Sequence, residues 1–504
     1  MRQSWKGLIR AYQSFCAILI LLFITASDIA AAAPVSEATE TCLDCHASVT
    51  PGIVADWQNS RHAQVTPAEA VARDEINRRV SVAEVPEDMA AYTVGCAECH
   101  MLNPETHADN FDHNDYSVHT VVTPLDCAAC HPVEETQYRE NIMSWANVNL
   151  SENQLYQSMI HSINGLQHFS DYKTTYDEPD EIVNEQACFF CHGTEVTVSG
   201  LETRETDLGE MDFPVLTGWP NVGVGRINPD GSRGSCSSCH ARHQFSIEVA
   251  RKPYTCAECH KGPDVPAYSV YSVSKHGNIF SSSGDKWDFA DVPWVAGEDF
   301  TAPTCAVCHI SLVVNEDEEV IAERTHRMND RLDRRIFGLI YAHPHPKSPR
   351  TSIISNKVGL PLPTELTGEP VSEFLIDSTE QAKRKATMEN VCLACHGSQW
   401  VTGHFEALER TVEETNEMTL TATNIISQVW RENFAMGLPQ GDNIFDEAVE
   451  KMWVEQWLFF ANSTRFAAAM SGADYGVFAN GRWYQSKNIQ QLHDWLKLRR
   501  ELRK

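Results

Sequence analysis

The stretch Cys188-Phe189-Phe190-Cys191-His192 decides how this sequence is interpreted. Two cysteines separated by two residues and followed at once by a histidine form the attachment pattern of a c-type haem. The two thiols bond covalently to the porphyrin, and the histidine becomes the proximal ligand of the iron. The stretch therefore predicts one covalently held haem at this point of the chain.

The same five-residue pattern occurs eight times along the 504 residues. Random placement of the 17 cysteines and 21 histidines would give only about 0.02 copies per chain. A disulfide-rich secreted domain would not place a histidine after every cysteine pair, and zinc sites do not require one. We therefore expect eight haem c groups, each with its iron.

Each copy supplies two cysteines that hold the cofactor and one histidine that binds its iron. The cysteines are Cys42, Cys45, Cys96, Cys99, Cys127, Cys130, Cys188, Cys191, Cys236, Cys239, Cys256, Cys259, Cys305, Cys308, Cys392 and Cys395. The proximal histidines are His46, His100, His131, His192, His240, His260, His309 and His396. Motifs five and six begin only 20 residues apart, so we expect their haems to lie close together.

The first 33 residues have the features of a secretory signal peptide. A basic start precedes a short apolar run over residues 15–26, and small residues at 30–33 offer a cleavage site. The one cysteine outside the motifs, Cys16, would leave with this segment. A retained N-terminal anchor is the alternative, although the run is short for a membrane span. Because c-type haems are assembled outside the cytoplasm, we expect a soluble periplasmic protein.

The distribution of the motifs predicts the fold class. They extend from residue 42 to residue 396, so the haems form much of one core with short helices, ordered loops and few strands between them. Residues 405–504 carry no motif, and their apolar side chains recur at helical spacing. We expect a mainly α multihaem cytochrome c, with an octahaem domain over 34–404 and a C-terminal helical bundle over 405–504. Glycine and proline predict an ordered loop over 218–231.

The charge of the chain limits its partners. The formal net charge is −29, which excludes nucleic acid as a partner. Strong acidity suits a basic redox partner, although solubility alone explains it equally well. An anionic substrate would need a local patch of positive charge.

Thirteen histidines remain once the eight proximal ones are set aside. A haem that only transfers electrons favours iron with two protein ligands, whereas a catalytic haem keeps one face open. Thirteen candidates allow either eight closed haems or seven closed haems and one open haem. Local context favours seven histidines as distal ligands: His62, His119, His161, His243, His276, His326 and His404.

Three stretches, together with the eight motifs and the motif-free C-terminus, resemble the octahaem hydroxylamine oxidoreductase family. They are residues 218–232 (Gly-Trp-Pro-Asn-Val-Gly-Val-Gly-Arg-Ile-Asn-Pro-Asp-Gly-Ser), residues 239–246 (Cys-His-Ala-Arg-His-Gln-Phe-Ser) and residues 274–279 (Ser-Lys-His-Gly-Asn-Ile). The resemblance implies a mostly helical homotrimer. It also implies that the fourth haem, on His192, is the active site and is five-coordinate, and that the other seven are bis-histidine electron carriers.

The resemblance also suggests pocket residues. The family usually has an Asp-His pair just after the sixth motif; here Asp264 matches the first residue and Val265 stands in place of the second. Since valine cannot carry a proton, Asp264 is the expected acid–base group. Tyr341 resembles the family's pocket tyrosine, and His343 or His345 is a possible replacement proton donor. The alternative is that Val265 marks a protein with weakened or lost activity.

The C-terminal region bears on the direction of catalysis. Family members that oxidise hydroxylamine or hydrazine carry a tyrosine cross-linked to the catalytic porphyrin, and residues 472–484 resemble the members that lack it. Neither Tyr475 nor Tyr484 aligns clearly with that tyrosine. We therefore expect an oxidoreductase that reduces nitrite or hydroxylamine and receives electrons from a small redox protein or a quinone-linked cytochrome. The alternatives are a hydroxylamine or hydrazine dehydrogenase and a non-catalytic electron conduit.

Overall fold

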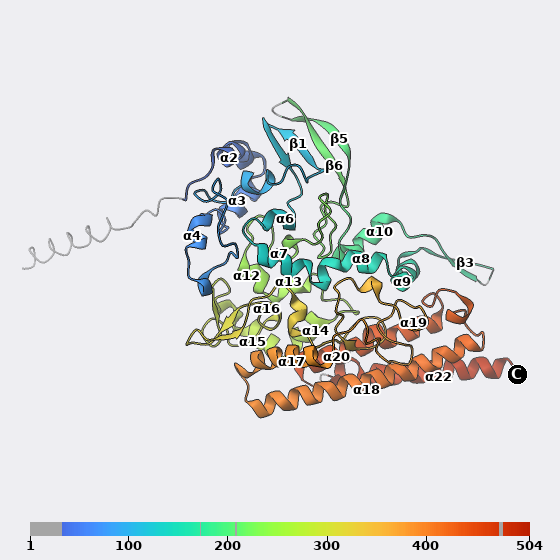
Figure 1. Ribbon diagram of the computed structural model, residues 1–504. Helices are drawn as coiled ribbons and strands as arrows, with labels where there is room; N and C mark the ends of the chain where they lie inside the picture. The colour runs from blue at the N-terminus through green and yellow to red at the C-terminus, as the bar shows by residue number, and fades with distance from the viewer. Residues whose placement is uncertain (1–32, 172, 207–208, 473–476) are drawn as a thin grey trace, which may run out of the picture.

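The computed structural model describes residues 33–171, 173–206, 209–472 and 477–504. Almost all of the predicted signal peptide, with Cys16, lies outside these residues, as does Tyr475. The segments that carry the haem motifs make up the larger part of the molecule, and the long helices of the C-terminal region run along one side of it (Figure 1).

Most helices before residue 310 are short. They are α2 (Glu37–Val49), α3 (Pro51–Gln58), α4 (Pro67–Val71), α5 (Ala97–His100), α6 (Pro124–Cys127), α7 (Pro132–Arg139), α8 (Ala146–Ser151), α9 (Gln154–Asn164), α10 (Glu181–Gln186), α11 (Cys188–His192), α12 (Ile247–Arg251), α13 (Pro253–Ala257), α14 (Ala267–Val273), α15 (Lys275–Ser283) and α16 (Cys305–His309). Longer helices follow, namely α17 (Ser378–Leu393), α18 (Ser398–Arg431), α19 (Ala448–Val454), α20 (Asn462–Ser471) and α22 (Trp483–Leu502). Two π-helical segments, η8 (Glu455–Ala461) and η9 (Phe478–Arg482), continue this C-terminal series.

The strands form small sheets. The antiparallel pairs are β1 (Asn110–His113) with β2 (Tyr116–His119), β3 (Gln167–Ser170) with β4 (Lys173–Tyr176), β5 (Thr197–Thr206) with β6 (Gly209–Thr217), and β10 (Arg334–Arg335) with β11 (His343–Pro344). A three-stranded sheet joins β7 (Trp294–Val295), β8 (Val313–Val314) and β9 (Val320–Ala322). The fold is therefore mainly helical with some sheet, and the β5–β6 hairpin is longer than the few short strands that the sequence predicts.

Local chemistry explains where α9 begins and ends. The side chain of Asn153 caps it, accepting hydrogen bonds from the backbone N–H of Leu155 at 2.9 Å and of Tyr156 at 3.3 Å. Gly165 then adopts an extended conformation and ends the helix. The apolar and polar pattern of residues 156–168 predicts a helix; the structure has one over the first part, whereas His168 lies in β3.

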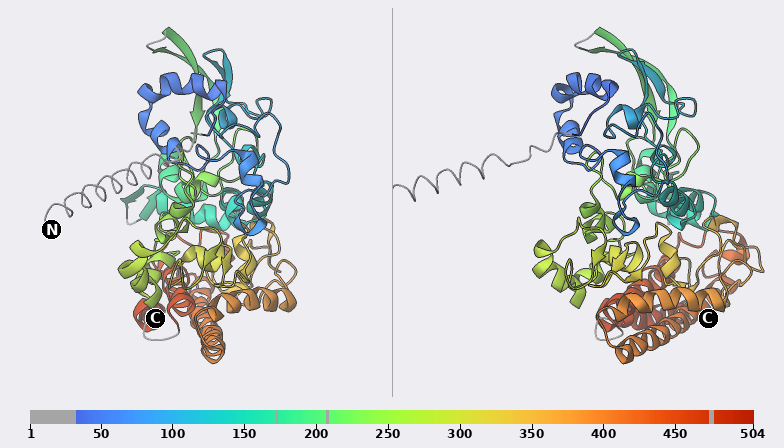
Figure 2. Two further views of the ribbon diagram at one scale, coloured as in Figure 1. Left: turned by 90° about the vertical axis from the view of Figure 1, so that its left-hand side faces the viewer. Right: turned by 60° about the vertical axis from the view of Figure 1, so that its left-hand side comes forward.

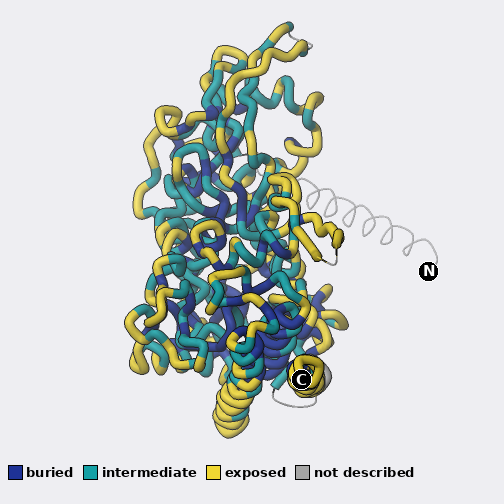
Figure 3. Tube along the Cα trace, turned by 90° about the vertical axis from the view of Figure 1, so that its right-hand side faces the viewer, coloured by how far each residue is buried: buried dark blue, intermediate teal, exposed yellow. Residues whose placement is uncertain are grey.

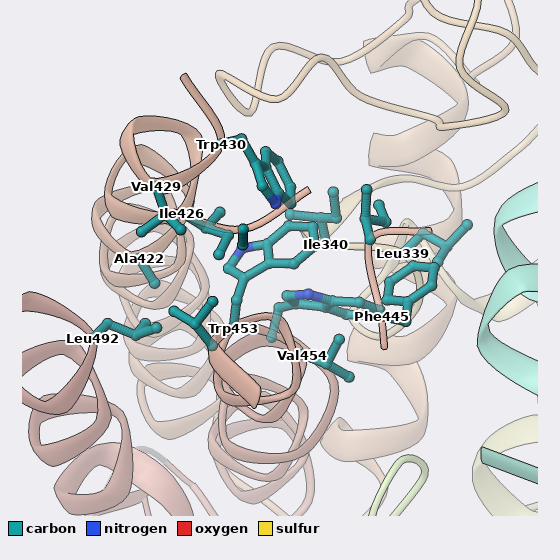
Figure 4. Close-up of a cluster of buried hydrophobic side chains, with 14 of the residues drawn as sticks. Leu339, Ile340, Ala422, Ile426, Val429, Trp430, Phe445, Trp453, Val454 and Leu492 are labelled. Carbon is teal, nitrogen blue, oxygen red and sulfur yellow. The ribbon is translucent and has the colours of Figure 1, made fainter. Parts of the chain in front are cut away.

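The C-terminal helices bury the largest apolar cluster. α18 packs against α19, α20 and α22, and Trp430, Trp453 and Trp457 are almost completely inaccessible. Figure 4 shows Trp430 and Trp453 side by side with Ile426 and Leu492. Burying one such side chain contributes roughly 1.5–3 kcal/mol. The helices predicted for this region are present, while the division into two domains stays a prediction.

Burial is uneven along the molecule. Figure 3 shows buried residues gathered toward the end that holds the C-terminal helices, whereas intermediate burial dominates elsewhere. The motif cysteines are intermediate or exposed. The β5–β6 hairpin stands at the end opposite α18 and α22 (Figure 2). Among the described residues, no helix combines the length and apolar character that crossing a membrane requires.

Candidate haem ligands and active site

Cysteines of different motifs lie against one another. The thiols of four pairs lie close enough to shift each other's pKa, namely Cys42 with Cys96, Cys127 with Cys236, Cys191 with Cys259, and Cys256 with Cys305. These contacts join motif one to two, three to five, four to six, and six to seven. Haems attached at such positions would be neighbours in space.

Electrostatic effects between further cysteines show which other motifs are neighbours. Burial, and then the neighbouring Cys256 thiol, raises the pKa of Cys239 to about 12. This places motif five beside motif six, as their short separation in the sequence predicted. Burial, and then Cys392, likewise raises the pKa of Cys308 to about 12, which places motif seven beside motif eight. With Cys99 close to Cys130, motif two also meets motif three.

Several proximal histidines have their Nδ1 atoms engaged by the chain itself. The Nδ1 of His100 lies 2.8 Å from the His119 carbonyl oxygen, and the Nδ1 of His192 lies 3.2 Å from the Ala146 carbonyl oxygen. A carbonyl only accepts, so Nδ1 donates and, in the neutral ring, Nε2 is left unprotonated for iron. Burial lowers the pKa of His192, which favours this neutral form. The fourth motif is therefore built to bind a metal through Nε2.

Three proximal histidines face a second imidazole at a spacing that suits one iron between them. A bond from a metal to a histidine nitrogen is about 2 Å long, so rings on opposite sides of one iron have centres roughly 6 Å apart. The ring centres are 6.2 Å apart for His46 and His113, 6.4 Å for His131 and His62, and 6.1 Å for His396 and His276. The spacing of each pair therefore suits two axial histidine ligands of one haem c iron.

His100 has two imidazole neighbours at this spacing. His119 lies at 6.0 Å and His243 at 6.5 Å between ring centres. The His119 carbonyl oxygen accepts a hydrogen bond from Nδ1 of His100. Iron would bind Nε2, on the other side of the His100 ring. His119 also stacks on His107 at 3.5 Å, and its Nε2 lies 3.7 Å from Asp126. His243 is therefore the better placed of the two predicted ligands.

The other predicted distal ligands differ in their surroundings. Burial, and then His240, lowers the pKa of His326 to about 4, so His326 lies near the fifth motif. His161 is partly exposed, with Nε2 3.6 Å from Glu178, and its ligand role stays a prediction. His404 stacks on Trp400, which separates it from the ring of His396.

Asp264 lies near the fourth and sixth motifs. Its negative charge raises the pKa of His192, His260 and Cys188. In each case this effect is smaller than that of burial. The backbone carbonyl of Asp264 accepts a hydrogen bond of 2.9 Å from the Asn462 side chain. Its neighbour Val265 packs against the apolar cluster of α20, which gives that position a structural use for an apolar side chain.

A small cavity adjoins this region. Its volume is about 20 Å³, and its lining includes Asn153, Tyr156, Arg335 and His343. That volume accommodates a group about the size of one water molecule. Arg335 and His343 stand directly opposite each other in the β10–β11 pair. The positive charge of Arg335 also lowers the pKa of His192. This effect is smaller than those of burial, the Ala146 carbonyl and Asp264. The cavity thus lies within electrostatic reach of the fourth motif.

The surroundings of His343 bear on the proton-donor role predicted for it, which stays a prediction. Burial, and then Arg335, lowers its pKa to about 3, so the ring is neutral near pH 7. Its Nδ1 donates to the Pro344 carbonyl oxygen at 2.7 Å, which leaves Nε2 as an acceptor or metal ligand. His345 has the same arrangement, with Nδ1 3.3 Å from the Pro346 carbonyl oxygen.

Tyr341 and Tyr484 occupy packing positions. Tyr341 belongs to the large apolar cluster, its hydroxyl donates to the Leu366 carbonyl oxygen at 2.8 Å, and burial raises its pKa to about 12. The lining of the cavity does not include it. Tyr484 is half-exposed and stacks on Phe460 with ring centres 5.5 Å apart. The predicted pocket role of Tyr341 stays a prediction.

Known proteins resemble two parts of the haem-motif region and the chain as a whole. Residues 227–328 match the family described as seven times multi-haem cytochrome CxxCH, and residues 41–132 match the family of cytochrome c554 and c-prime. A solved structure titled "Hypothetical multiheme protein" is 40% identical, covers 94% of this chain and 98% of its own, and superimposes with a TM-score of 0.87. The chain belongs to the multihaem cytochromes c. It therefore binds haem c covalently.

Two further relatives of this multihaem cytochrome come from Kuenenia stuttgartiensis. A probable nitrite reductase–hydroxylamine oxidoreductase fusion protein is 24% identical over 402 residues, which make up 78% of this chain. The chain spans only 38% of that relative's length. A solved reducing HAO-like protein complex is 17% identical, with a TM-score of 0.61 over 92% of this chain and 86% of its own, and this likeness concerns the fold alone.

Two residues of this multihaem cytochrome carry little signal in the sequence. His113 and His119 lie in one polar stretch before the third motif, and local context does not distinguish them. The approach of Arg335 to the fourth motif depends on the short β10–β11 pair. Alternation along β10 was the available signal: Arg334 and Arg335 must point to opposite sides of a strand.

Proposed function

We propose that this multihaem cytochrome is an octahaem oxidoreductase that reduces nitrite or hydroxylamine at the haem held by Cys188, Cys191 and His192. The observation that carries the proposal is the charged surroundings of the fourth motif, where Asp264 and Arg335 both act on His192. The name of the Kuenenia relative, which joins nitrite reductase and hydroxylamine oxidoreductase, supports this class of substrate.

The residues of the chain have distinct roles in the proposed reaction. Haem iron with one open face supplies the binding position for a nitrogen compound and the electrons for its reduction. The Ala146 carbonyl orients His192 through Nδ1. Asp264 holds and passes protons as the bond between nitrogen and oxygen breaks. Leu339 adds an apolar side chain to the lining of the cavity.

The contacts between motifs support a continuous route for electrons. Motifs one, two, three, five, six, seven and eight follow one another in space, and motif four joins the series at motif six through Cys191 and Cys259. In the proposed enzyme, seven bis-histidine haems deliver electrons along this series to the fourth haem.

The test is reduction of nitrite and of hydroxylamine by the purified protein with a reduced dye as electron donor. Asp264→Asn should lower the rate by about 10²–10⁴-fold, because it removes the group that transfers protons. Asp177→Asn is the control, since Asp177 pairs with His168 at the surface. Equal rates for wild type and Asp264→Asn would remove Asp264 from the mechanism.

Two alternatives have separate tests. A hydroxylamine or hydrazine dehydrogenase would carry a tyrosine cross-link, which gives the reduced protein an absorption band far to the red of ordinary c-type haems. A non-catalytic conduit would have no open iron, so cyanide and nitric oxide would leave its spectrum unchanged. Electron paramagnetic resonance with only low-spin signals would favour the conduit.

We also propose that the protein works in the periplasm as a homotrimer, with a small redox protein or a quinone-linked cytochrome as electron donor. The features of the N-terminus and the assembly of c-type haem outside the cytoplasm support the location. Cell fractionation tests the location, and light scattering of the purified protein tests the trimer.

A further inference from the structure

Two histidines and an aspartate meet at the base of the β1–β2 hairpin, between the second and third motifs. Nε2 of His107 lies 3.3 Å from Oδ1 of Asp126, and Nε2 of His119 lies 3.7 Å from Oδ2 of the same carboxylate. One ligand atom from each residue falls within 4.8 Å of the other two. Two ligands of a tetrahedral zinc ion are roughly 3.3 Å apart, because each bond is about 2 Å long. The cluster is therefore close to the dimensions of one metal site.

The side chains of this cluster are buried, and His119 lacks the partners that a buried ring normally has. The side chains of His107 and His119 are completely inaccessible. Neither ring nitrogen of His119 has a hydrogen-bond partner among the described residues. The iron of the second haem has His243 as its better placed ligand, because the His119 carbonyl meets His100 at Nδ1. A metal ion between His119 Nε2 and Asp126 would satisfy the unpaired nitrogen.

A further carboxylate and the backbone hold the cluster in place. Nδ1 of His107 lies 3.3 Å from Oδ1 of Asp109, whose Oδ2 accepts hydrogen bonds from the backbone N–H groups of residues 120–121 at 3.0 and 2.8 Å. A carboxylate on Nδ1 leaves Nε2 for a metal, and this arrangement supports the histidine ligands of zinc. Asp126 is fixed as well, since its Oδ1 accepts a hydrogen bond of 2.9 Å from Asn103.

The charge of the cluster also favours a cation. Among the residues that the structure describes, Asp109 and Asp126 form ion pairs with histidines and with no lysine or arginine. Burial lowers the pKa of His107, but hydrogen bonds to the two carboxylates outweigh it and raise the value to about 9. Two buried carboxylates and one imidazolium leave one net negative charge, which is costly to bury. A divalent ion that displaces the proton makes the cluster neutral, whereas haem propionates are negative and would not.

The ligand types identify the class of metal. Two imidazoles and a carboxylate suit Zn²⁺, whereas Ca²⁺ and Mg²⁺ prefer oxygen ligands alone. The rings of His107 and His119 stack with their planes 5° apart, so their lone pairs are nearly parallel. Rotation of one ring about its Cβ–Cγ bond, which is a soft torsion, directs both Nε2 atoms toward one ion.

We propose that His107, His119 and Asp126 bind one structural zinc ion, with Asp109 supporting His107. This inference goes beyond the proposed function, because it depends on neither the substrate nor the direction of the reaction.

The position of the site gives the ion its structural role. His119 of β2 pairs with Asn110 at the base of the hairpin. The hairpin carries His113, which faces His46 across the first haem, and the His119 carbonyl holds the ring of His100. Zinc therefore clamps the base of a hairpin that supports axial ligands of the first and second haems.

The first experiment measures zinc in the purified holoprotein after loading with zinc sulfate and desalting, by inductively coupled plasma mass spectrometry. Wild type should hold about one zinc per chain, and X-ray absorption at the zinc edge should show imidazole ligands. His119→Phe keeps a ring against His107 but removes both nitrogens, so its zinc content should fall by at least about tenfold. His168→Phe, at the surface beside Asp177, is the matched control and should bind zinc as wild type does.

A second variant covers the case in which His119→Phe does not fold. Asp109→Asn keeps all three ligands and should weaken zinc binding by about 10–100-fold, because the support of His107 is lost. Wild type that holds no zinc after loading overturns the inference, and so does zinc that His119→Phe binds equally well. A new high-spin ferric signal in His119→Phe, with no zinc in wild type, assigns His119 to haem iron and also overturns it.

The second experiment tests the clamp by hydrogen exchange of residues 107–121, followed by mass spectrometry. Removing zinc from wild type with dipicolinate should speed exchange in this segment, and adding zinc back should slow it again, because a bound ion opposes local opening. His119→Phe should respond to neither treatment. Exchange that is the same with and without zinc overturns the clamp.

Discussion

Glu450 holds a carboxyl group among the C-terminal helices, where no water reaches its side chain. Burial raises its pKa to about 8, against the opposing effect of hydrogen bonds from the Glu447 backbone and the Trp430 indole. An unfolded chain has the ordinary value near 4.5 at this position. Between these values the folded state binds more protons, so stability falls as pH rises from about 4.5 to about 8 and is level above that.

Glu450→Gln should make the unfolding free energy less dependent on pH. Wild type should lose about 3 kcal/mol between pH 6 and pH 9 from this group, and the variant should not. Thermal unfolding of the holoprotein at several pH values measures the difference. Glu413→Gln is the control, because Glu413 is exposed on α18. Parallel profiles for wild type and Glu450→Gln would show that Glu450 is ionised in the folded protein.

His113 is the residue placed to close the iron of the first haem opposite His46. Among the described residues its Nδ1 has no hydrogen-bond partner. His113→Ala should convert this haem from low-spin to high-spin, because one axial ligand is lost. Electron paramagnetic resonance measures the change, and His168→Ala, at the surface beside Asp177, should leave the spectrum as it is. An unchanged His113→Ala spectrum would point to another ligand.

The two sets of haem ligands were not equally predictable. A proximal histidine follows its cysteines directly, so local covalent geometry fixes its partner. A distal histidine comes from a remote segment, and only the tertiary fold brings it to the iron: His62 reaches His131, and His276 reaches His396. Polar context can therefore only nominate candidates: His161, for example, has its Nε2 3.6 Å from Glu178, and its ligand role stays a prediction.

At the scale of elements, the glycine-rich loop over 218–231 forms the backbone support of the fourth motif. Gly193 directly follows the motif with φ of +91°, and a Cβ there would lie 2.2 Å from the Arg226 nitrogen. Gly223 approaches equally closely from the loop, since its Cβ would lie 2.4 Å from the Gly193 nitrogen. Composition was enough to predict an ordered loop, but it could not reveal which motif the loop supports.

Gly223→Ala should prevent the loop from closing on the fourth motif. The added methyl would meet backbone atoms that cannot move aside, so we expect a loss of about 3 kcal/mol or more and incomplete haem attachment at Cys188 and Cys191. Haem content and thermal unfolding measure both effects. Gly231→Ala is the matched control in the same loop: its φ of +79° costs about 1–2 kcal/mol, but no atom lies within 4 Å. Equal stability of the two variants would contradict this account.

At the scale of the whole molecule, the order of the motifs in space differs from their order in the chain. Motif five follows motif three, and motif four contacts motif six, 68 residues further along from Cys191 to Cys259. Adjacency of motifs five and six could be predicted because a short segment joins them. The contact between motifs four and six could not, because it depends on how the β5–β6 hairpin and the following loop return the chain.

The net charge of −29 should govern how an electron donor approaches. A small basic cytochrome is attracted at long range, and salt screens this attraction over a Debye length of about 10 Å at 0.1 M. The rate of reduction by a basic cytochrome should therefore fall steeply as ionic strength rises. The rate of reduction by an acidic cytochrome should rise over the same range, because salt screens its repulsion. A neutral dye should show little change and serves as the control. Stopped-flow absorbance of the haems measures all three rates, and a basic donor whose rate is independent of salt would mean that the acidity serves solubility alone.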